Sequence, residues 1–93
     1  MASSGQTRQS VSEIVTYTID YEHDLPSGAT VSSAAVTHIP PSGSASVPSV
    51  GLSSPNVSVQ VGPLTTPGRH VFVILATLSN GDISEFDLII QVP

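Results

Sequence analysis

Cysteine, tryptophan and lysine are all absent from this chain of 93 residues. Without cysteine, no disulfide can cross-link the fold and no thiolate can bind a metal ion. The only cationic side chains are Arg8 and Arg69, and the formal net charge is −5. Two arginines cannot neutralise a phosphate backbone or hold a chain on an anionic bilayer, so we expect neither nucleic acid nor a membrane as a partner.

Long apolar runs are missing as well. The longest, from Val71 to Ala76, is too short to span a bilayer, and residues 1–10 are polar and lack the apolar segment of a secretory signal. We therefore expect synthesis in the cytoplasm, with release only by lysis or as part of a larger particle. Residues 1–10 are predicted to form a flexible arm, and residues 11–93 a single domain.

The chain is rich in apolar residues that alternate with polar ones, a period of two that is typical of β-strands. The alternation covers residues 11–21, residues 57–61 and both sides of Asn80-Gly81; it is weaker at residues 29–39, and a further short piece lies at residues 45–47. Proline and glycine pairs separate these segments, and none has helical periodicity. The pattern predicts an all-β fold, an antiparallel immunoglobulin-like β-sandwich of six to eight strands.

Asn80-Gly81 lies between two apolar runs and predicts a β-hairpin with a two-residue type I′ turn. Pairing outward from this turn places one face of the hairpin in the core, and that face comprises Val71, Val73, Leu75, Phe86, Leu88 and Ile90. The other face is apolar too, apart from two carboxylates, and it comprises Phe72, Ile74, Leu78, Ile83, Glu85, Asp87 and Ile89. So much apolar surface predicts a protein interface, covered by a second copy or by another protein. The carboxylates either prevent aggregation or give the interface charge specificity.

Residues with catalytic or metal-binding chemistry are few. The three histidines match no spacing of zinc ligands, and we expect them to be exposed or at sheet edges. They are His23, His38 and His70. Asp20, Glu22 and Asp24 share one face of an extended segment, but they lack the glycine turn and final glutamate of a calcium loop. No serine lies in a nucleophile elbow, so we expect no enzymatic activity, no metal and no cofactor.

Three segments carry a resemblance to a known group of proteins. They are the Y-x-I-D segment at Tyr17, Ile19 and Asp20, the V-S-S strand that starts at Val31, and the final hairpin, at Asn80, Gly81, Asp82, Glu85, Leu88, Ile90 and Val92. From Val11 onward, the chain resembles small immunoglobulin-like proteins encoded among the virion genes of tailed bacteriophages. Some members of this group are called fibre–tail adaptors, and others are capsid decoration proteins.

The resemblance implies a non-enzymatic structural protein of the virion, made in the host cytoplasm and docked on the particle as a capsid decoration or cement protein. A tail-fibre or neck adaptor is the alternative within the same class. Phage capsid or tail proteins are then the expected partners, and a homo-oligomer stays open. A cell-surface or glycan-binding immunoglobulin-like module is an alternative from another class. It would need exposed aromatic platforms, and the chain has only 2 tyrosines and 2 phenylalanines.

Overall fold

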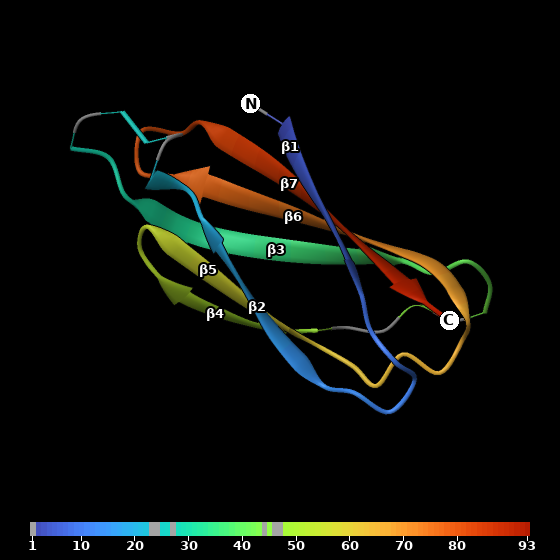
Figure 1. The fold of residues 1–93 in the computed structure, drawn as a ribbon. Coiled ribbons are helices and arrows are strands. Elements are labelled where there is room, and N and C mark those ends of the chain that lie inside the picture. Colours follow the sequence, from blue (N-terminus) through green and yellow to red (C-terminus); the bar gives the residue numbers. More distant parts are fainter. Residues whose placement is uncertain (1, 23–24, 27, 44, 46–47) are drawn as a thin grey trace.

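Seven strands form two sheets in the computed structural model, which describes residues 2–22, 25, 26, 28–43, 45 and 48–93 (Figure 1). The strands are β1 (Ala2–Arg8), β2 (Val15–Asp20), β3 (Val31–Ile39), β4 (Ser49–Ser53), β5 (Asn56–Val61), β6 (Gly68–Leu78) and β7 (Ile83–Val92). The four-stranded sheet has the order β1-β7-β6-β3, and the three-stranded sheet has the order β2-β5-β4. The prediction of an all-β fold is confirmed. Among the described residues, no helix is long and apolar enough to cross a membrane.

Strands β2, β3 and β5 lie where the alternation predicts them. Strand β4 was not predicted, because its serines and glycine give no β pattern and all five of its residues are exposed. It forms by pairing with β5 at the edge of the three-stranded sheet. The extended piece predicted at residues 45–47 lies largely outside the described residues.

The core fills the space between the two sheets. The three-stranded sheet and its flanks supply Ile19, Tyr21, Val57, Val59, Val61 and Leu64, and the four-stranded sheet supplies Val31, Phe72, Ile74, Ala76, Leu78, Leu88, Ile90 and Val92. The valines of β5 alternate with Ser58 and Gln60, so one face of that strand is apolar and the other polar. Burying a large apolar side chain of this kind contributes about 1.5–3 kcal/mol, which makes these residues the main source of stability.

The β6–β7 hairpin has a three-residue loop, not the predicted two-residue turn. The N–H of Leu78 donates to the carbonyl of Asp82 at 2.7 Å, and the N–H of Gly81 donates to the carbonyl of Leu78 at 2.9 Å. Gly81 has a φ of +94°, and no residue other than glycine has a positive φ among the described residues. A type I′ turn requires a positive φ at Asn80 as well, so the loop is a type I turn followed by a left-handed glycine.

The longer loop shifts the strand pairing by one residue and reverses the face assignment of β6. Phe72 pairs with Leu88 and Ile74 pairs with Phe86. The prediction that Phe72, Ile74 and Leu78 point away from the core is therefore wrong, and all three are core residues. The prediction that Val71, Val73 and Leu75 lie in the core is wrong for the same reason, since a shift of one residue moves every side chain to the other face. On β7, the core placement of Phe86, Leu88 and Ile90 is confirmed, and Phe86 packs at the core margin.

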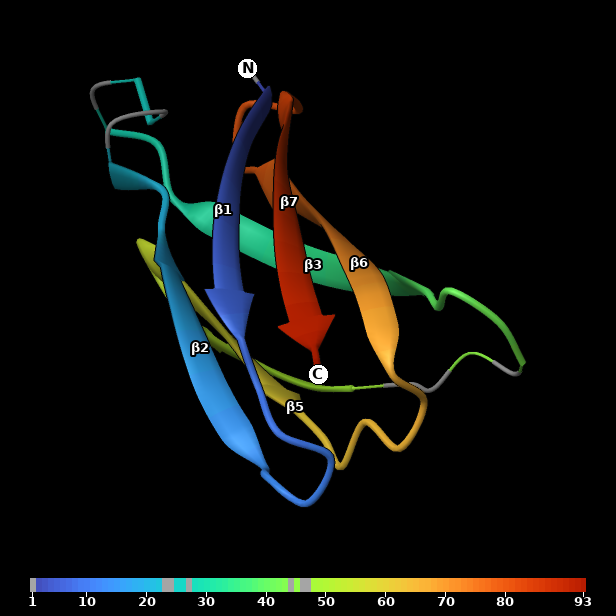
Figure 2. The same cartoon turned by 45° about the vertical axis from the view of Figure 1, so that its right-hand side comes forward.

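The first ten residues, predicted to form a flexible arm, include a strand. Ala2–Arg8 pairs with β7 in parallel, and Figure 2 shows the two strands side by side and pointing the same way. The prediction of a wholly antiparallel sandwich is therefore wrong at this edge, while the other strand pairs are antiparallel. Strand β1 can be polar because it lies at the edge of the sheet and pairs with β7 through its backbone N–H and C=O groups. Gly5 brings its backbone close to the ring of Phe86, where a Cβ atom would meet a ring carbon at 3.1 Å.

Gln9 fastens the end of β1 to the three-stranded sheet. Its side chain is 1% exposed. The Nε2 group donates to the carbonyls of Glu13 at 2.9 Å and Val61 at 3.1 Å, and Oε1 accepts from the hydroxyl of Tyr17 at 2.9 Å. A buried amide with its polar atoms paired stabilises one arrangement of the chain, because losing a partner would leave a buried polar group unsatisfied.

Candidate protein interface

One face of the four-stranded sheet is turned away from the core, and we call it the outer face. It carries Gln6 and Arg8 of β1; Ile83, Glu85, Asp87, Ile89 and Gln91 of β7; Arg69, Val71, Val73, Leu75 and Thr77 of β6; and Ser33, Ala35, Thr37 and Ile39 of β3. Each of these residues alternates along its strand with an inward-facing neighbour. The outer face therefore spans all four strands.

The outer face is largely apolar in its middle. The strand register aligns Ile39, Val71 and Ile89 in one row across the sheet. Ile39 is 52% exposed, Leu75 38% and Ile83 61%, while Val71, Val73 and Ile89 are half-buried among their neighbours. A contiguous apolar surface of this kind is characteristic of a protein interface.

The charged residues of the outer face are separated along β7. Arg69 and Arg8, the only two cations of the chain, both lie in the row of Gln91, one on each side of it. Asp87 and Glu85 lie four and six residues back along β7, a distance of about 13–20 Å at the usual rise per residue. The face therefore has a basic end and an acidic end with apolar residues between them.

The two carboxylates interact with each other. A hydrogen bond to the Asp87 side chain, together with the negative charge of Asp87, raises the pKa of Glu85. Asp87 Oδ1 is withdrawn from water and has no hydrogen-bond partner among the described residues. A carboxylate oxygen without a donor is costly, so this pair is suited to a cationic donor from another molecule.

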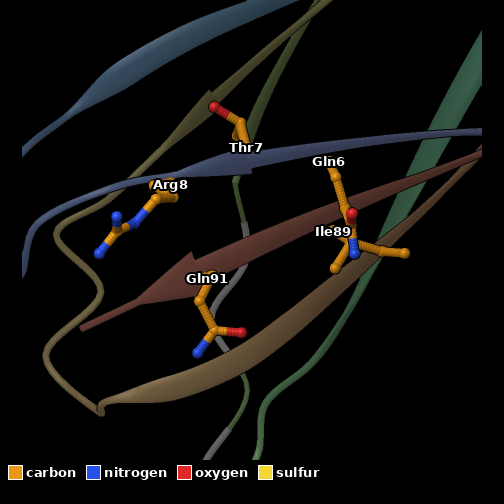
Figure 3. Close-up of a pocket in the computed structure, with 5 residues that line it drawn as sticks. All are labelled: Gln6, Thr7, Arg8, Ile89 and Gln91. Carbon is orange, nitrogen blue, oxygen red and sulfur yellow. The ribbon is translucent and has the colours of Figure 1, made fainter.

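A shallow hollow of about 380 Å³ lies on the outer face beside the basic end. It is lined by Gln6, Thr7, Arg8, Ile89 and Gln91 from β1 and β7 (Figure 3). Figure 3 shows Gln6, Ile89 and Gln91 on the same side of the sheet, with Thr7 pointing away from them. An apolar floor and a nearby guanidinium can accept a side chain that ends in a carboxylate.

The structure divides the seven predicted interface residues into two groups. Ile83, Glu85, Asp87 and Ile89 lie on the outer face, and Phe72, Ile74 and Leu78 lie in the core. Three residues that the hairpin register had placed in the core, Val71, Val73 and Leu75, take their places on the outer face. A role of this face in binding stays a prediction. Ile39, Arg8 and Arg69 were missed, because only the sheet order places β1 and β6 beside β7, and β3 beside β6.

Two histidines predicted to be exposed or at sheet edges are buried together at the other side of the sheet. His38 is 7% exposed and His70 is 2% exposed, so neither side chain is exposed. His38 does lie on β3, an edge strand of the four-stranded sheet, whereas His70 lies on β6, between β7 and β3, where the prediction is wrong. His38 Nε2 lies 2.8 Å from His70 Nδ1, and the ring of His38 stacks on Phe72 with centroids 4.3 Å apart. His70 Nε2 lies 2.7 Å from the carbonyl oxygen of Thr66. His23 lies outside the described residues.

The carbonyl of Thr66 determines the direction of this hydrogen-bond chain. A carbonyl oxygen only accepts, so His70 carries its proton on Nε2 and, when neutral, accepts at Nδ1 from His38 Nε2–H. Both nitrogens of His70 are thus engaged in structural hydrogen bonds. A small hollow of about 120 Å³ adjoins the pair, lined by His38, Pro40, Pro63, Leu64, Thr65, Thr66 and His70. The described residues include no group of three potential metal ligands.

Acid should destabilise the protein through His38. Burial, and secondarily the neighbouring His70, lowers the pKa of His38 below 6.5 in the folded state. The unfolded chain therefore takes up a proton at His38 that the folded chain resists, and stability that is present above about pH 6.5 declines as the pH falls toward the folded pKa. Thermal unfolding between pH 7 and pH 5, as an approximate window, should show a falling midpoint. In His38→Phe this slope should flatten; an unchanged slope would contradict the assignment to His38.

Of the three carboxylates expected to share one face near Tyr21, the structure describes Asp20 and Glu22. Asp20 Oδ1 accepts from the N–H of Glu22 at 2.9 Å, and both side chains are exposed. Asp24 lies outside the described residues. The carboxylate of Asp20 thus stabilises the turn that follows β2.

A scan against protein-family models finds no match, and a search of curated proteins finds none either.

Proposed function

We propose that this protein is a non-enzymatic structural component of a tailed-phage virion, with an immunoglobulin-like sandwich that is held in its assembly through the outer face. The strand order supports the immunoglobulin-like topology. Strands β2, β5 and β4 correspond to the B-E-D sheet of that fold, and β3, β6 and β7 correspond to the C-F-G sheet. Strand β1 adds to the sheet beside the G-like strand.

The observation that carries the proposal is the second apolar surface of the four-stranded sheet. The inner surface already forms the core, so the apolar outer face is not required for folding. A domain that presents this face serves by association with other proteins. The resemblance to small virion proteins supplies the kind of assembly, with capsid decoration first and a tail or neck adaptor second.

The glycan-binding alternative receives less support from the side chains. Tyr21 and Phe72 are buried, and Tyr17 and Phe86 are half-buried, so the chain's four aromatic side chains form no exposed platform. Stacking against a sugar ring requires an accessible aromatic face.

Incorporation into particles tests the proposal. Virions grown from the genome that encodes this chain should contain it, and Leu75→Asp should reduce its incorporation at least about tenfold, because a charge is stranded in a dry interface. The matched control is Thr18→Asp, an exposed strand position on the three-stranded sheet, which should incorporate like the wild type. Both isolated variants should unfold near the wild-type temperature. Absence of the wild-type chain from the particles, or full incorporation of Leu75→Asp, would contradict the proposal.

A further inference from the structure

The distribution of charge on the outer face points to a self-complementary surface. We propose that the partner covering the outer face is a second copy of this chain, in a two-fold dimer that stacks outer face on outer face with the two β7 strands antiparallel. The inference rests on the proposed function only in taking the outer face as the interface. It names the molecule on the other side.

The separation of charges along β7 selects the antiparallel arrangement. A two-fold axis that runs across the strands near Ile89 exchanges the ends of the face. The row of Arg8, Gln91 and Arg69 in one copy then lies over the row of Asp87 in the other, and the reverse contact forms at the opposite end. Both arginines lie beside β7, one on each side, so they approach the facing Asp87 carboxylate from both flanks. A parallel stack would instead oppose arginine to arginine and carboxylate to carboxylate.

The apolar row lies where such an axis passes. Ile39, Val71 and Ile89 of one copy would contact the same row of the other, and the charged rows would flank this apolar centre. An apolar core with a charged rim is the usual composition of a protein interface. The hollow floored by Ile89 and bordered by Arg8 lies opposite the Asp87 end of the other copy and gives a carboxylate side chain room to enter.

The part of the chain that the structure describes offers no partner for these charges. No ion pair joins Arg8 or Arg69 to a carboxylate among the described residues, and Asp87 Oδ1 has no donor there. The guanidinium of a facing Arg69 or Arg8 would supply that donor as the Glu85–Asp87 contact separates. One association would therefore satisfy groups at both ends of the face.

The size of the face predicts a reversible dimer. A patch that is nine residues long on β7 and four strands wide has an area of about 500 Å² per copy, or about 1,000 Å² in total, from standard strand spacings. This area lies at the lower limit for specific interfaces, so the dimer should form and dissociate with concentration. Added salt should weaken it, because the charged rows stay close to solvent.

Sedimentation equilibrium over a range of protein concentration tests the inference. The wild type should pass from 9.5 kDa to twice that mass. The double variant Arg8→Glu with Arg69→Glu and the double variant Glu85→Arg with Asp87→Arg should each dimerise at least about tenfold more weakly. An equimolar mixture of the two should restore dimers, since opposite charges then face each other. The control, Glu22→Arg, changes an exposed charge off the face and should dimerise like the wild type.

A wild type that stays at 9.5 kDa at every concentration overturns the dimer. Charge-reversed variants that dimerise as well as the wild type overturn it too, and a mixture that restores nothing overturns the antiparallel geometry. The proposed function fails separately. A chain that enters particles but never dimerises contradicts this inference alone, and a dimer that never enters particles contradicts the proposed function alone.

Discussion

Ile74→Ala should lower the free energy of unfolding by about 2–5 kcal/mol, whereas Leu75→Ala should lower it by less than about 1 kcal/mol. Ile74 is 0% exposed and lies between the sheets, so its truncation leaves a cavity that the packed neighbours fill only in part. Leu75 is 38% exposed on the outer face, where solvent replaces the lost methyl groups. Urea denaturation of the two variants, compared through their midpoints and slopes, measures the difference.

The two positions are adjacent on one strand, so each variant is the control for the other. A type I′ turn at Asn80-Gly81 would reverse the expected order, with Leu75→Ala the more damaging change. Equal losses would contradict both registers. For a small domain with about 5–15 kcal/mol of total stability, the loss expected for Ile74→Ala leaves a substantial unfolded population on heating.

Gly62→Ala should cost about 3 kcal/mol or more. Gly62 has a φ of +126°, and a Cβ atom there would overlap the carbonyl oxygen of Glu13 and lie 2.8 Å from Gln9 Nε2. The same carbonyl accepts the hydrogen bond from Gln9, so the substitution both strains the backbone and displaces the side chain that holds β1 to the three-stranded sheet. Thermal unfolding and amide hydrogen exchange in β1 would report the two effects.

Gly28→Ala is the matched control. Gly28 also has a positive φ, of +82°, but a Cβ atom there meets nothing within 4 Å. Its cost should be limited to the conformational penalty of a left-handed alanine, about 1–2 kcal/mol, with β1 as protected as in the wild type. If Gly62→Ala costs no more than Gly28→Ala, the close approach of Gly62 to Gln9 and Glu13 does not hold in solution.

The sequence predicts strands well where apolar and polar residues alternate. Val57, Val59 and Val61 are separated by polar residues, so the strand, its face and its burial all follow. Strand β6 is apolar on both faces, so its pattern does not identify the buried face: Val71 and Val73 on one face are as apolar as Phe72 and Ile74 on the other. Which side chains of β6 face the core then depends on the number of residues in the loop. That number depends on whether Asn80, like Gly81, adopts a left-handed backbone conformation.

The remaining differences concern features without a hydrophobic pattern. Strand β1 forms through backbone hydrogen bonds to β7, and Gln9 is buried because three polar partners surround it. For the histidines a signal was present. His38 has the same parity as Val36, and His70 the same parity as Phe72, so both belong to the inward face once the register is known. The charge pattern of the outer face could not be predicted, because it depends on the order of the strands in the sheet, and local sequence patterns do not determine that order.

The pairing of β1 with β7 has a consequence for how the molecule is assembled. Ala2 lies opposite Glu85, so this contact closes a loop of nearly the whole chain, while the β6–β7 hairpin closes over three residues. Loop entropy favours early hairpin formation and late docking of β1. Until β1 docks, β7 is an open edge with unpaired N–H and C=O groups, and another molecule's β1 can occupy it. The parallel pairing of β1 with β7 therefore also allows two molecules to exchange their β1 strands. A fusion at the N-terminus that slows the docking of β1 should increase this strand exchange.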